Sequence, residues 1–122
     1  MDQLNPMHLT LASQSPRRRQ LLTEAGIDHA VRPSGIDDGL LTPGDHCTPA
    51  EWVMALALLK AAATARQPDL HPGTIVLGAD TVCVNNDQVL GQPADEQDAR
   101  RMIRAMASTT HDVLTGVALI CT

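Results

Sequence analysis

Residues 9–22, LTLASQSPRRRQLL, carry the strongest structural and chemical signals in the chain. The apolar start predicts a short buried strand, the hydroxyl-rich middle predicts a turn, and the end predicts a helix. Ser15 is a favoured N-cap residue, and Pro16 suits the first helical position because its missing N–H costs nothing there. Arg17, Arg18 and Arg19 would then occupy the first turn, where the helix dipole disfavours cations. Guanidinium groups beside free backbone N–H groups predict a site for a polyanion, most simply a phosphate chain.

The alternative is that the three arginines form a solvated helix face, as arginine runs usually do. Their position directly after a strand, a cap and a proline favours the anion site. Successive side chains of a helix are about 100° apart, so at most two of the three arginines can face one ligand. The stretch is not a P-loop, because it lacks the G-x-x-x-x-G-K-[ST] pattern.

Composition narrows the class of partner. A chain of 122 residues suits one domain with a modest core. Its formal net charge of −5 argues against binding a nucleic acid polymer, which would require a basic face. Trp52 is the only aromatic residue of the Trp, Tyr and Phe type. Recognition of a base by aromatic stacking is therefore nearly excluded within these residues.

The sequence also bears on where the protein works. The N-terminus shows no charged-then-apolar signal segment, and no apolar run is long enough to span a membrane. Cys47, Cys83 and Cys121 show neither zinc-ligand spacing nor a disulfide framework. We expect a cytoplasmic protein with no membrane partner.

Strand and helix patterns alternate along the chain. Thr48 and Glu51 form a capping box that starts a second helix, and Asp95 is expected to cap a third. The expected helices cover residues 16–25, 49–66 and 96–107, and the expected strands cover residues 9–11, 27–31, 74–84, 88–90 and 111–121. We expect the third strand to be interrupted at residues 78–81 and the last to be broken or bent near Gly116. This order predicts an α/β fold.

Several charged residues stand out against this pattern. Asp80 interrupts an apolar strand and is followed by Thr81; a turn residue is the alternative, but carboxylates at strand ends are typical metal ligands or general bases. Lys60 is the only charge between Trp52 and Ala65, in an apolar helix that we expect to be buried, so it should meet an anion or reach solvent. Asp37 and Asp38 lie in a glycine-flanked loop. These carboxylates could hold Mg²⁺, and the helix start supplies cations. The combination indicates phosphoryl chemistry on a nucleotide-like substrate.

Six segments keep a common order and spacing from residue 9 to the end of the chain. They read LASQSPRRRQLL (residues 11–22), IDD (36–38), LALLKA (56–61), LGADTV (77–82), LGQP (90–93) and THDVLTGV (110–117). By these segments the chain resembles the Maf family of nucleoside triphosphate pyrophosphatases, also called septum-formation-inhibitor proteins.

The resemblance implies an activity and a fold. The activity is hydrolysis of a nucleoside triphosphate to the monophosphate and pyrophosphate with a divalent cation, Mg²⁺ or Mn²⁺, in order to clear unwanted nucleotides from the pool. The SPRR and ADT sequences are similar to those of the branch that acts on dTTP and UTP. The implied fold resembles that of inosine triphosphate pyrophosphatases, an elongated mixed sheet flanked by helices with a cleft between two lobes. Family members are often dimers, so a homodimer is also implied.

The resemblance further implies roles for individual residues. Ser13, Arg17 and Arg18 match the phosphate-binding turn of the family, which leaves Arg19 on the surface. Lys60 matches a lysine that contacts phosphate, and we assign it to the catalytic group.

The carboxylates match as well. Asp80 matches the general base or metal ligand of the family, with Thr81 beside it at the substrate, and Asp38 matches an acidic loop position that we assign to the metal. Gln92 stands where the family usually has lysine; its amide can hydrogen-bond a phosphate oxygen but carries no charge.

The family continues with a further lobe that this sequence does not contain. We therefore expect residues 1–8 to form a flexible leader and residues 9–122 to form a Maf-like domain whose second lobe is missing. The alternative function is a non-catalytic nucleotide- or phosphate-binding protein, which Gln92 and the early end favour. A plain interaction domain would require the arginine cluster to be incidental.

Overall fold

The computed structural model describes residues 8–37, 41–91 and 93–122. Asp38 and Gln92, two of the predicted site residues, lie outside these ranges, as do residues 1–7 of the expected leader. The expected leader boundary was wrong at His8, because this residue begins strand β1 (His8–Leu11) and pairs with Thr74 in a parallel ladder.

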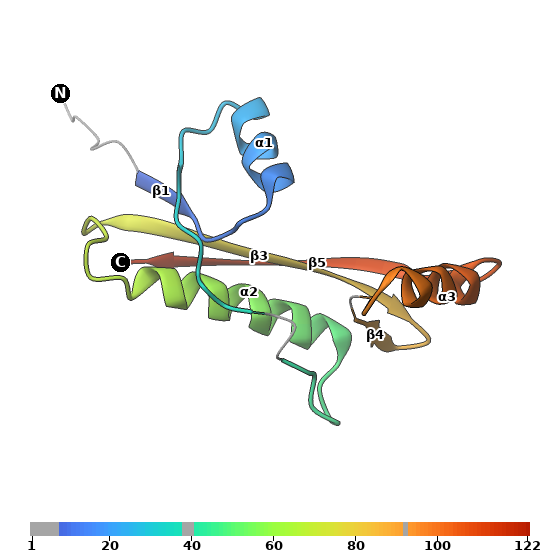
Figure 1. Cartoon of the computed structure of the whole chain (residues 1–122). Helices are drawn as coiled ribbons and strands as arrows, with labels where there is room; N and C mark the ends of the chain where they lie inside the picture. The colour runs from blue at the N-terminus through green and yellow to red at the C-terminus, as the bar shows by residue number, and fades with distance from the viewer. Residues whose placement is uncertain (1–7, 38–40, 92) are drawn as a thin grey trace.

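In the described part of the chain the sheet is mixed and has five strands, which confirms the predicted α/β class. Strand β1 pairs in parallel with β2 (Ala30–Val31) and with the first residues of β3 (Thr74–Asn85). The antiparallel partners of β3 are β4 (Gln88–Leu90) and β5 (Asp112–Cys121). Strand β5 follows nearly all of one edge of β3, whereas β1 and β4 share the other edge. The long strands β3 and β5 give the molecule its elongated shape (Figure 1).

Each helix begins after a residue whose side chain caps it, as the sequence predicts. The caps and helices are Ser15 for α1 (Pro16–Glu24), Thr48 for α2 (Pro49–Ala65) and Asp95 for α3 (Glu96–Met106). The capping box of α2 is complete, because Glu51 N donates to Thr48 Oγ1 at 3.1 Å and Thr48 N donates to Glu51 Oε1 at 3.2 Å. The pKa of Glu51 is lowered, first by the hydrogen bond from the Thr48 hydroxyl and then by the one from its backbone.

Helices α1 and α2 lie on opposite faces of the sheet (Figure 1). The core lies on the α2 side, where Val53, Leu56 and Ala57 are buried. Met54 and Leu58, on the other side of α2, are 54 % and 53 % exposed. The expectation that α2 is buried was therefore only half correct: its apolar circumference is wider than the one sheet face that it covers.

Two glycines allow α2 to approach the sheet closely. A Cβ atom on Gly78 would overlap the carbonyl oxygen of Ala57, and one on Gly116 would lie 2.6 Å from the carbonyl oxygen of Val53. Both glycines sit inside continuous strands, so the expected interruption of β3 and the expected break near Gly116 were wrong. These glycines are packing positions, where a strand residue without a side chain admits the helix backbone.

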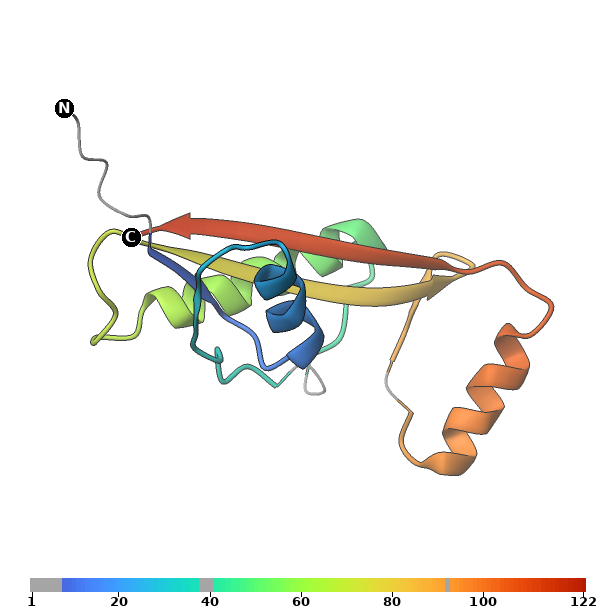
Figure 2. The ribbon, with the colours of Figure 1, turned by 90° about the horizontal axis from the view of Figure 1, so that it is seen from above.

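Helix α3 lies beyond the β3–β4 hairpin, at the opposite end of the molecule from the C-terminus (Figure 2). Its Met102 and Met106 are half-buried, whereas Ile103 is 64 % exposed. Within the described ranges, no helix has the length and apolar character needed to cross a membrane.

Candidate functional site

Strand β3 has a gap along one edge. β1 pairs with residues 74–77 and β4 with residues 83–85, and in the described part of the chain no strand pairs with residues 78–82 on that side. The ladder with β1 closes at the hydrogen bond from Ala12 N to Leu77 O, at 2.8 Å. The chain then leaves the sheet in the turn that leads to α1, so the side chains of this turn gather beside the gap. Crevices at points where strands diverge are frequent ligand sites in α/β sheets.

The turn before α1 is held by its own serines. The hydroxyl of Ser13, a buried residue, accepts a hydrogen bond from Ser15 N at 3.0 Å, and Ser15 Oγ accepts one from Arg18 N at 3.3 Å. Arg18 then reaches strand β3, where its Nη2 donates to Thr81 Oγ1 at 3.1 Å. Local capping thus starts the helix, and a contact across 63 residues of sequence orients its second arginine.

Lys60 of α2 and Asp80 of β3 form an ion pair, with Nζ and Oδ1 2.9 Å apart. Their side chains are only 13 % and 10 % exposed, so the pair is largely removed from water. The expectation that Lys60 meets an anion is confirmed. We expected Asp80 at the end of a strand. It lies instead in the middle of β3. Because side chains alternate along a strand, Asp80 shares with Gly78 the face that α2 covers.

A cavity of about 250 Å³ lies between the turn, helix α2 and the loop after β2. Its lining includes Ser13, Arg18, Asp37 and Lys60. Two cationic side chains and the N-terminus of α1 therefore face one space, which favours an anionic ligand. Asp80 is bound to Lys60 but is not among the described residues that line this cavity. We call this space the anion cavity.

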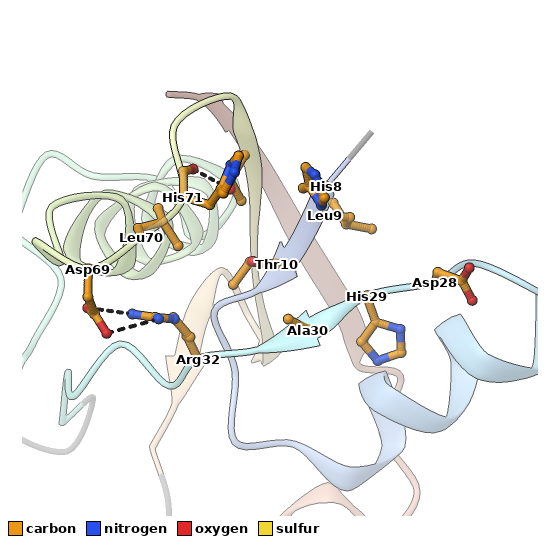
Figure 3. A pocket seen from close by; sticks show the side chains of 11 residues that line it. His8, Leu9, Thr10, Asp28, His29, Ala30, Arg32, Asp69, Leu70 and His71 are labelled. Carbon is orange, nitrogen blue, oxygen red and sulfur yellow. Dashed lines mark hydrogen bonds and ion pairs between the residues drawn. The ribbon is translucent and has the colours of Figure 1, made fainter. Parts of the chain in front are cut away.

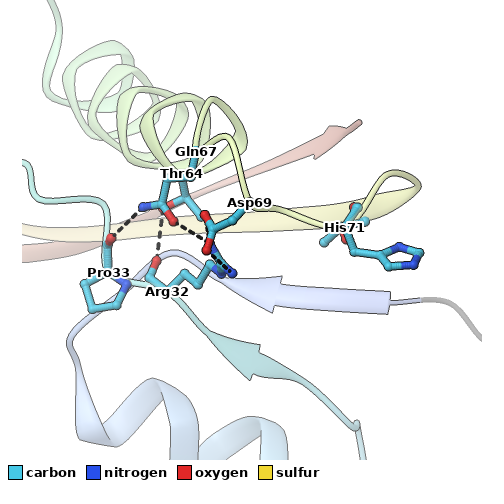
Figure 4. A network of polar contacts seen from close by, with 7 residues as sticks. Arg32, Pro33, Thr64, Gln67, Asp69 and His71 are labelled. Atoms are coloured by element: carbon cyan, nitrogen blue, oxygen red, sulfur yellow. Dashed lines mark hydrogen bonds and ion pairs between the residues drawn. The ribbon is translucent and has the colours of Figure 1, made fainter.

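A polar network holds Arg32 and Pro33, which begin the loop after β2 (Figure 4). Because this loop lines the anion cavity, we call it the anion-cavity loop. Arg32 donates to both carboxylate oxygens of Asp69, at 2.7 and 3.0 Å, and to Gln67 Oε1 at 3.0 Å. The carbonyl oxygens of Arg32 and Pro33 accept hydrogen bonds from Thr64 Oγ1 at 3.0 Å and Gln67 Nε2 at 3.3 Å. The hydrogen bonds from Arg32 lower the pKa of Asp69. The end of α2 and the residues after it thus fix where the loop begins.

A second cavity, of about 490 Å³, lies beneath α1 on the other face of the sheet. We call it the α1 cavity. Arg18 lines both cavities, whereas Arg17 lines only this one. The rest of its lining is mainly aliphatic, apart from Ser15 and the hydroxyls of Thr81 and Thr115.

A third cavity, of about 440 Å³, opens near the start of β1 (Figure 3). The imidazole rings of His8 and His71 lie 5.0 Å apart there, and the guanidinium of Arg32 is bound to Asp69. Of the predicted site residues that the structure describes, none lines this cavity. Its charged pair has the structural role described above, so it is not the candidate site.

The structure brings most of the predicted site residues to the gap in β3. Ser13, Arg18 and Lys60 line the anion cavity, Asp80 is bound to Lys60, and Thr81 is bound to Arg18.

The other predicted residues have different positions. Arg17 is exposed and turned toward the α1 cavity, and Arg19 is exposed and lines neither of the two cavities. Asp38 and Gln92 lie outside the described residues, so their roles stay predictions.

Sequence reasoning missed Thr115. Its Oγ1 lies 3.0 Å from Thr81 Oγ1, because the two residues are directly paired in the β3–β5 ladder. Thr115 belongs to the THDVLTGV segment, but only the strand register places its hydroxyl beside Thr81 and Arg18.

The residues near the gap do not form a closed metal cage. In the ranges that the structure describes, no three His, Cys, Asp or Glu side chains are grouped to hold a metal ion. Mg²⁺ usually takes one or two protein carboxylates and completes its shell with water and substrate phosphates. Asp37, which lines the anion cavity, and Asp80, which is bound to Lys60 in its lining, could supply these one or two protein carboxylates.

Comparison with known proteins gives a consistent result. The family model described as "Maf-like protein" matches residues 8–122. A protein named dTTP/UTP pyrophosphatase from Anaeromyxobacter dehalogenans (strain 2CP-C) is 48 % identical over 111 residues, which are 91 % of this chain and 52 % of the relative. A protein of the same name from Pelotomaculum thermopropionicum is 46 % identical over 112 residues, 92 % of this chain and 56 % of the relative. The chain thus spans about half the length of the curated relatives that it matches.

Proposed function

The chain belongs to the family of Maf-like proteins, and from that premise we propose that it acts in nucleoside triphosphate pyrophosphatase chemistry. The proposed reaction converts a nucleoside triphosphate and water into the monophosphate and pyrophosphate. The names of the relatives, dTTP/UTP pyrophosphatase, support a substrate of the dTTP or UTP type. The proposed cellular role is removal of unwanted nucleotides in the cytoplasm. A homodimer remains a prediction.

The observation that carries this proposal is the convergence of Arg18 and Lys60 on the anion cavity at the start of α1. A triphosphate is strongly anionic. Negative charge is redistributed between the reacting phosphate and the leaving group as the bond between them breaks. Fixed cations and backbone N–H groups stabilise that charge without reorganising. Charge-assisted hydrogen bonds from a guanidinium are also directional, which positions the phosphate chain.

The reaction itself requires attack of a water oxygen on the α-phosphorus. The bond between that phosphorus and the bridging oxygen to the β-phosphorus then breaks, and pyrophosphate leaves. We assign to Asp80 the role of taking the proton from the water, and Lys60, whose Nζ lies 2.9 Å from Asp80 Oδ1, would balance its charge. In the alternative role that the family resemblance implies, Asp80 binds a cation.

A divalent cation, Mg²⁺ or Mn²⁺, is part of the proposal. Asp80 would supply one carboxylate and Asp37, which lines the anion cavity, would supply another. Asp38 keeps its predicted metal role. Such a cation, when bound, neutralises charge on the phosphate oxygens.

A second candidate function is nucleotide binding without turnover. Gln92 favours it, because a neutral amide replaces a lysine that the family usually has and so removes one positive charge. The same cavity would then hold a nucleotide that is not cleaved.

The test is a panel of nucleoside triphosphates incubated with the purified protein and Mg²⁺ or Mn²⁺. We expect release of pyrophosphate, and not of orthophosphate, from UTP or dTTP. Binding of these nucleotides with no release of pyrophosphate would support the second candidate. Neither binding nor cleavage of any triphosphate would exclude both.

A further inference from the structure

We propose that Thr64, in the last turn of helix α2, and Gln67, just after the helix, are positioning residues for the divalent cation of the proposed reaction. Neither side chain lines the anion cavity. They hold the start of the anion-cavity loop and thereby set the place of Asp37, whose carboxylate we assign to the cation. The inference rests on the proposed function, because it concerns how that cation would be bound.

Thr64 lies one helical turn after Lys60 on α2. Residues four apart on a helix share a face and lie about 6 Å apart along its axis. Lys60 lines the anion cavity, and Thr64 Oγ1 donates to the carbonyl oxygen of Arg32 at 3.0 Å. One turn of α2 therefore sets the spacing between the cationic Lys60 and the loop that forms another wall of the cavity.

The backbone of Arg32 is held from two sides. Thr64 is 0 % exposed, so its hydroxyl proton has no access to water and is committed to the Arg32 carbonyl oxygen. On the other side, Arg32 N donates to the carbonyl oxygen of Leu11 at 2.9 Å, at the end of β1. The chain continues from Leu11 into the turn that contains Ser13. The start of the loop thus has a fixed place relative both to Lys60 and to that turn.

The amide of Gln67 fixes the next residue of the loop. Its Nε2 donates to the carbonyl oxygen of Pro33 at 3.3 Å, and its Oε1 accepts from Arg32 Nη1 at 3.0 Å (Figure 4). A side chain must carry both a donor and an acceptor to make these two contacts, as glutamine does. Both ends of the amide are used, so its orientation is set.

Asp37 lies only four residues after Pro33. The residues between them, Ser34, Gly35 and Ile36, also line the anion cavity, and Ile36 N donates to Ser34 Oγ at 3.2 Å. A displacement of Pro33 would be passed to Asp37 through this short, internally bonded segment. Groups that hold a metal ligand in place raise the affinity for the metal. Thr64 and Gln67 would act on the cation in this way, without touching it.

The test measures how much Mn²⁺ improves the binding of pyrophosphate, which needs no turnover. Calorimetric titrations with and without Mn²⁺ give this gain as a ratio of two Kd values. Thr64→Val keeps the shape and removes the hydroxyl, whereas Gln67→Glu keeps the acceptor for Arg32 and loses the donor to Pro33. We expect each variant to reduce the gain by about tenfold, the lower end of the effects of residues that hold metal ligands. Thr64→Ser should restore it.

Thr74→Val is the matched control. Thr74 is also a buried threonine, 2 % exposed, whose hydroxyl donates to a backbone carbonyl oxygen, that of His71. It lines the cavity near the start of β1 and not the anion cavity. We expect Thr64→Val and Thr74→Val to lower the stability in denaturant by similar amounts, and only Thr64→Val to lower the gain from Mn²⁺. Gln67 is half-buried, so Gln67→Glu carries the test if Thr64→Val does not fold.

The outcomes separate this inference from the proposed activity. If the gain falls in Thr64→Val and Gln67→Glu and returns in Thr64→Ser, but no triphosphate is cleaved, the inference stands and the activity fails. If triphosphates are cleaved and the gain is the same in the native protein and both variants, the activity stands and the inference is overturned. Equal losses of gain in Thr64→Val and Thr74→Val also overturn it, because the effect would follow stability alone. So does a native protein whose binding of pyrophosphate Mn²⁺ does not improve.

Discussion

Asp80 and Lys60 form the largely buried ion pair around which the candidate site is built. An isolated charge in an apolar helix and a carboxylate in an apolar strand are each costly to bury, and their pairing accounts for both. In the proposed reaction Asp80 takes a proton and Lys60 balances its charge, so the same pair would serve both the fold and the chemistry.

Asp80→Asn separates these two roles. The amide still accepts a hydrogen bond from Lys60, so we expect the fold to be retained, while the proton acceptor and the negative charge are lost. The kcat for pyrophosphate release should fall by about 10²- to 10⁴-fold. Asp87→Asn, in the β3–β4 turn where φ is positive and Asn is well tolerated, is the control. An unchanged kcat for Asp80→Asn would remove Asp80 from the mechanism.

The three arginines of α1 should differ in effect. Arg18 lines both cavities and binds Thr81, so Arg18→Ala should weaken triphosphate binding by about 2 kcal/mol, or about 30-fold in Kd. Arg17→Ala should have a smaller effect, because Arg17 is exposed and lines only the α1 cavity. Arg19→Ala, which has the same charge change, should leave Kd unaltered. Equal effects of all three variants in a calorimetric titration would mean that only net charge matters.

The contact between helix α2 and the sheet is the element-level feature that positions Lys60 over β3. Because the helix backbone lies against Gly78 and Gly116, its side chains at the next turn reach the middle of the strand. A wider spacing would separate Lys60 from Asp80.

Gly116→Ala tests this close approach. The new Cβ would lie 2.6 Å from the carbonyl oxygen of Val53, which is backbone and cannot rotate away. We expect a loss of about 1–3 kcal/mol in the free energy of unfolding, measured by denaturant titration. Gly44→Ala, where a Cβ would meet nothing within 4 Å, should change it by no more than about 0.5 kcal/mol. Equal stability of the two variants would show that helix and sheet are not in tight contact.

The Arg32–Asp69 pair, which holds the entrance of the anion-cavity loop, should make stability depend on pH. The pKa of Asp69 is lowered in the folded protein, first by the hydrogen bonds from Arg32. A carboxyl group with a lowered folded-state pKa stabilises above its unfolded pKa and loses that contribution as the pH falls through the folded value. The Tm difference between the native protein and Asp69→Asn should therefore be constant near neutral pH and shrink below about pH 4.

Salt provides the control for this prediction. The side chains of Arg32 and Asp69 are 32 % and 74 % exposed, so added salt should screen the pair and reduce the Tm difference at neutral pH. A difference that is independent of both pH and salt would show that the ion pair does not contribute to stability.

Across the whole molecule, the site joins elements that are distant in sequence: the turn before α1, helix α2, and strands β3 and β5. A ligand that contacts all of them stabilises the folded state as a unit. At a UTP concentration of 100 times Kd, this linkage is about 2.7 kcal/mol.

Thermal unfolding measures this linkage directly. For a chain of this length we expect saturating UTP to raise the Tm by about 10 °C. Uridine, which lacks the phosphates, should give a much smaller rise, and Arg18→Ala should reduce the response to UTP. An equal response to UTP and uridine would contradict a site built for the phosphate chain.

The local structure and the family could both be predicted from the sequence alone. Ser15, Thr48 and Asp95 are recognisable as caps because capping depends on a few neighbouring residues, and the family motifs are likewise contiguous. A cationic helix start was also recognisable, because the preference of helix N-termini for anions is a local property.

How these segments meet became clear from the folded chain. Gly78 and Gly116 resembled strand breaks in the sequence, and the packed helix shows them to be contact positions inside continuous strands. The placement of Asp80 in mid-strand beside Lys60, and of Thr115 beside Thr81, depends on the α2–sheet contact and on the β3–β5 register. Both join residues 20 or more positions apart. Such contacts depend on which faces of the helix and the strands can be buried together. They therefore cannot be predicted from the residues next to each position in the sequence.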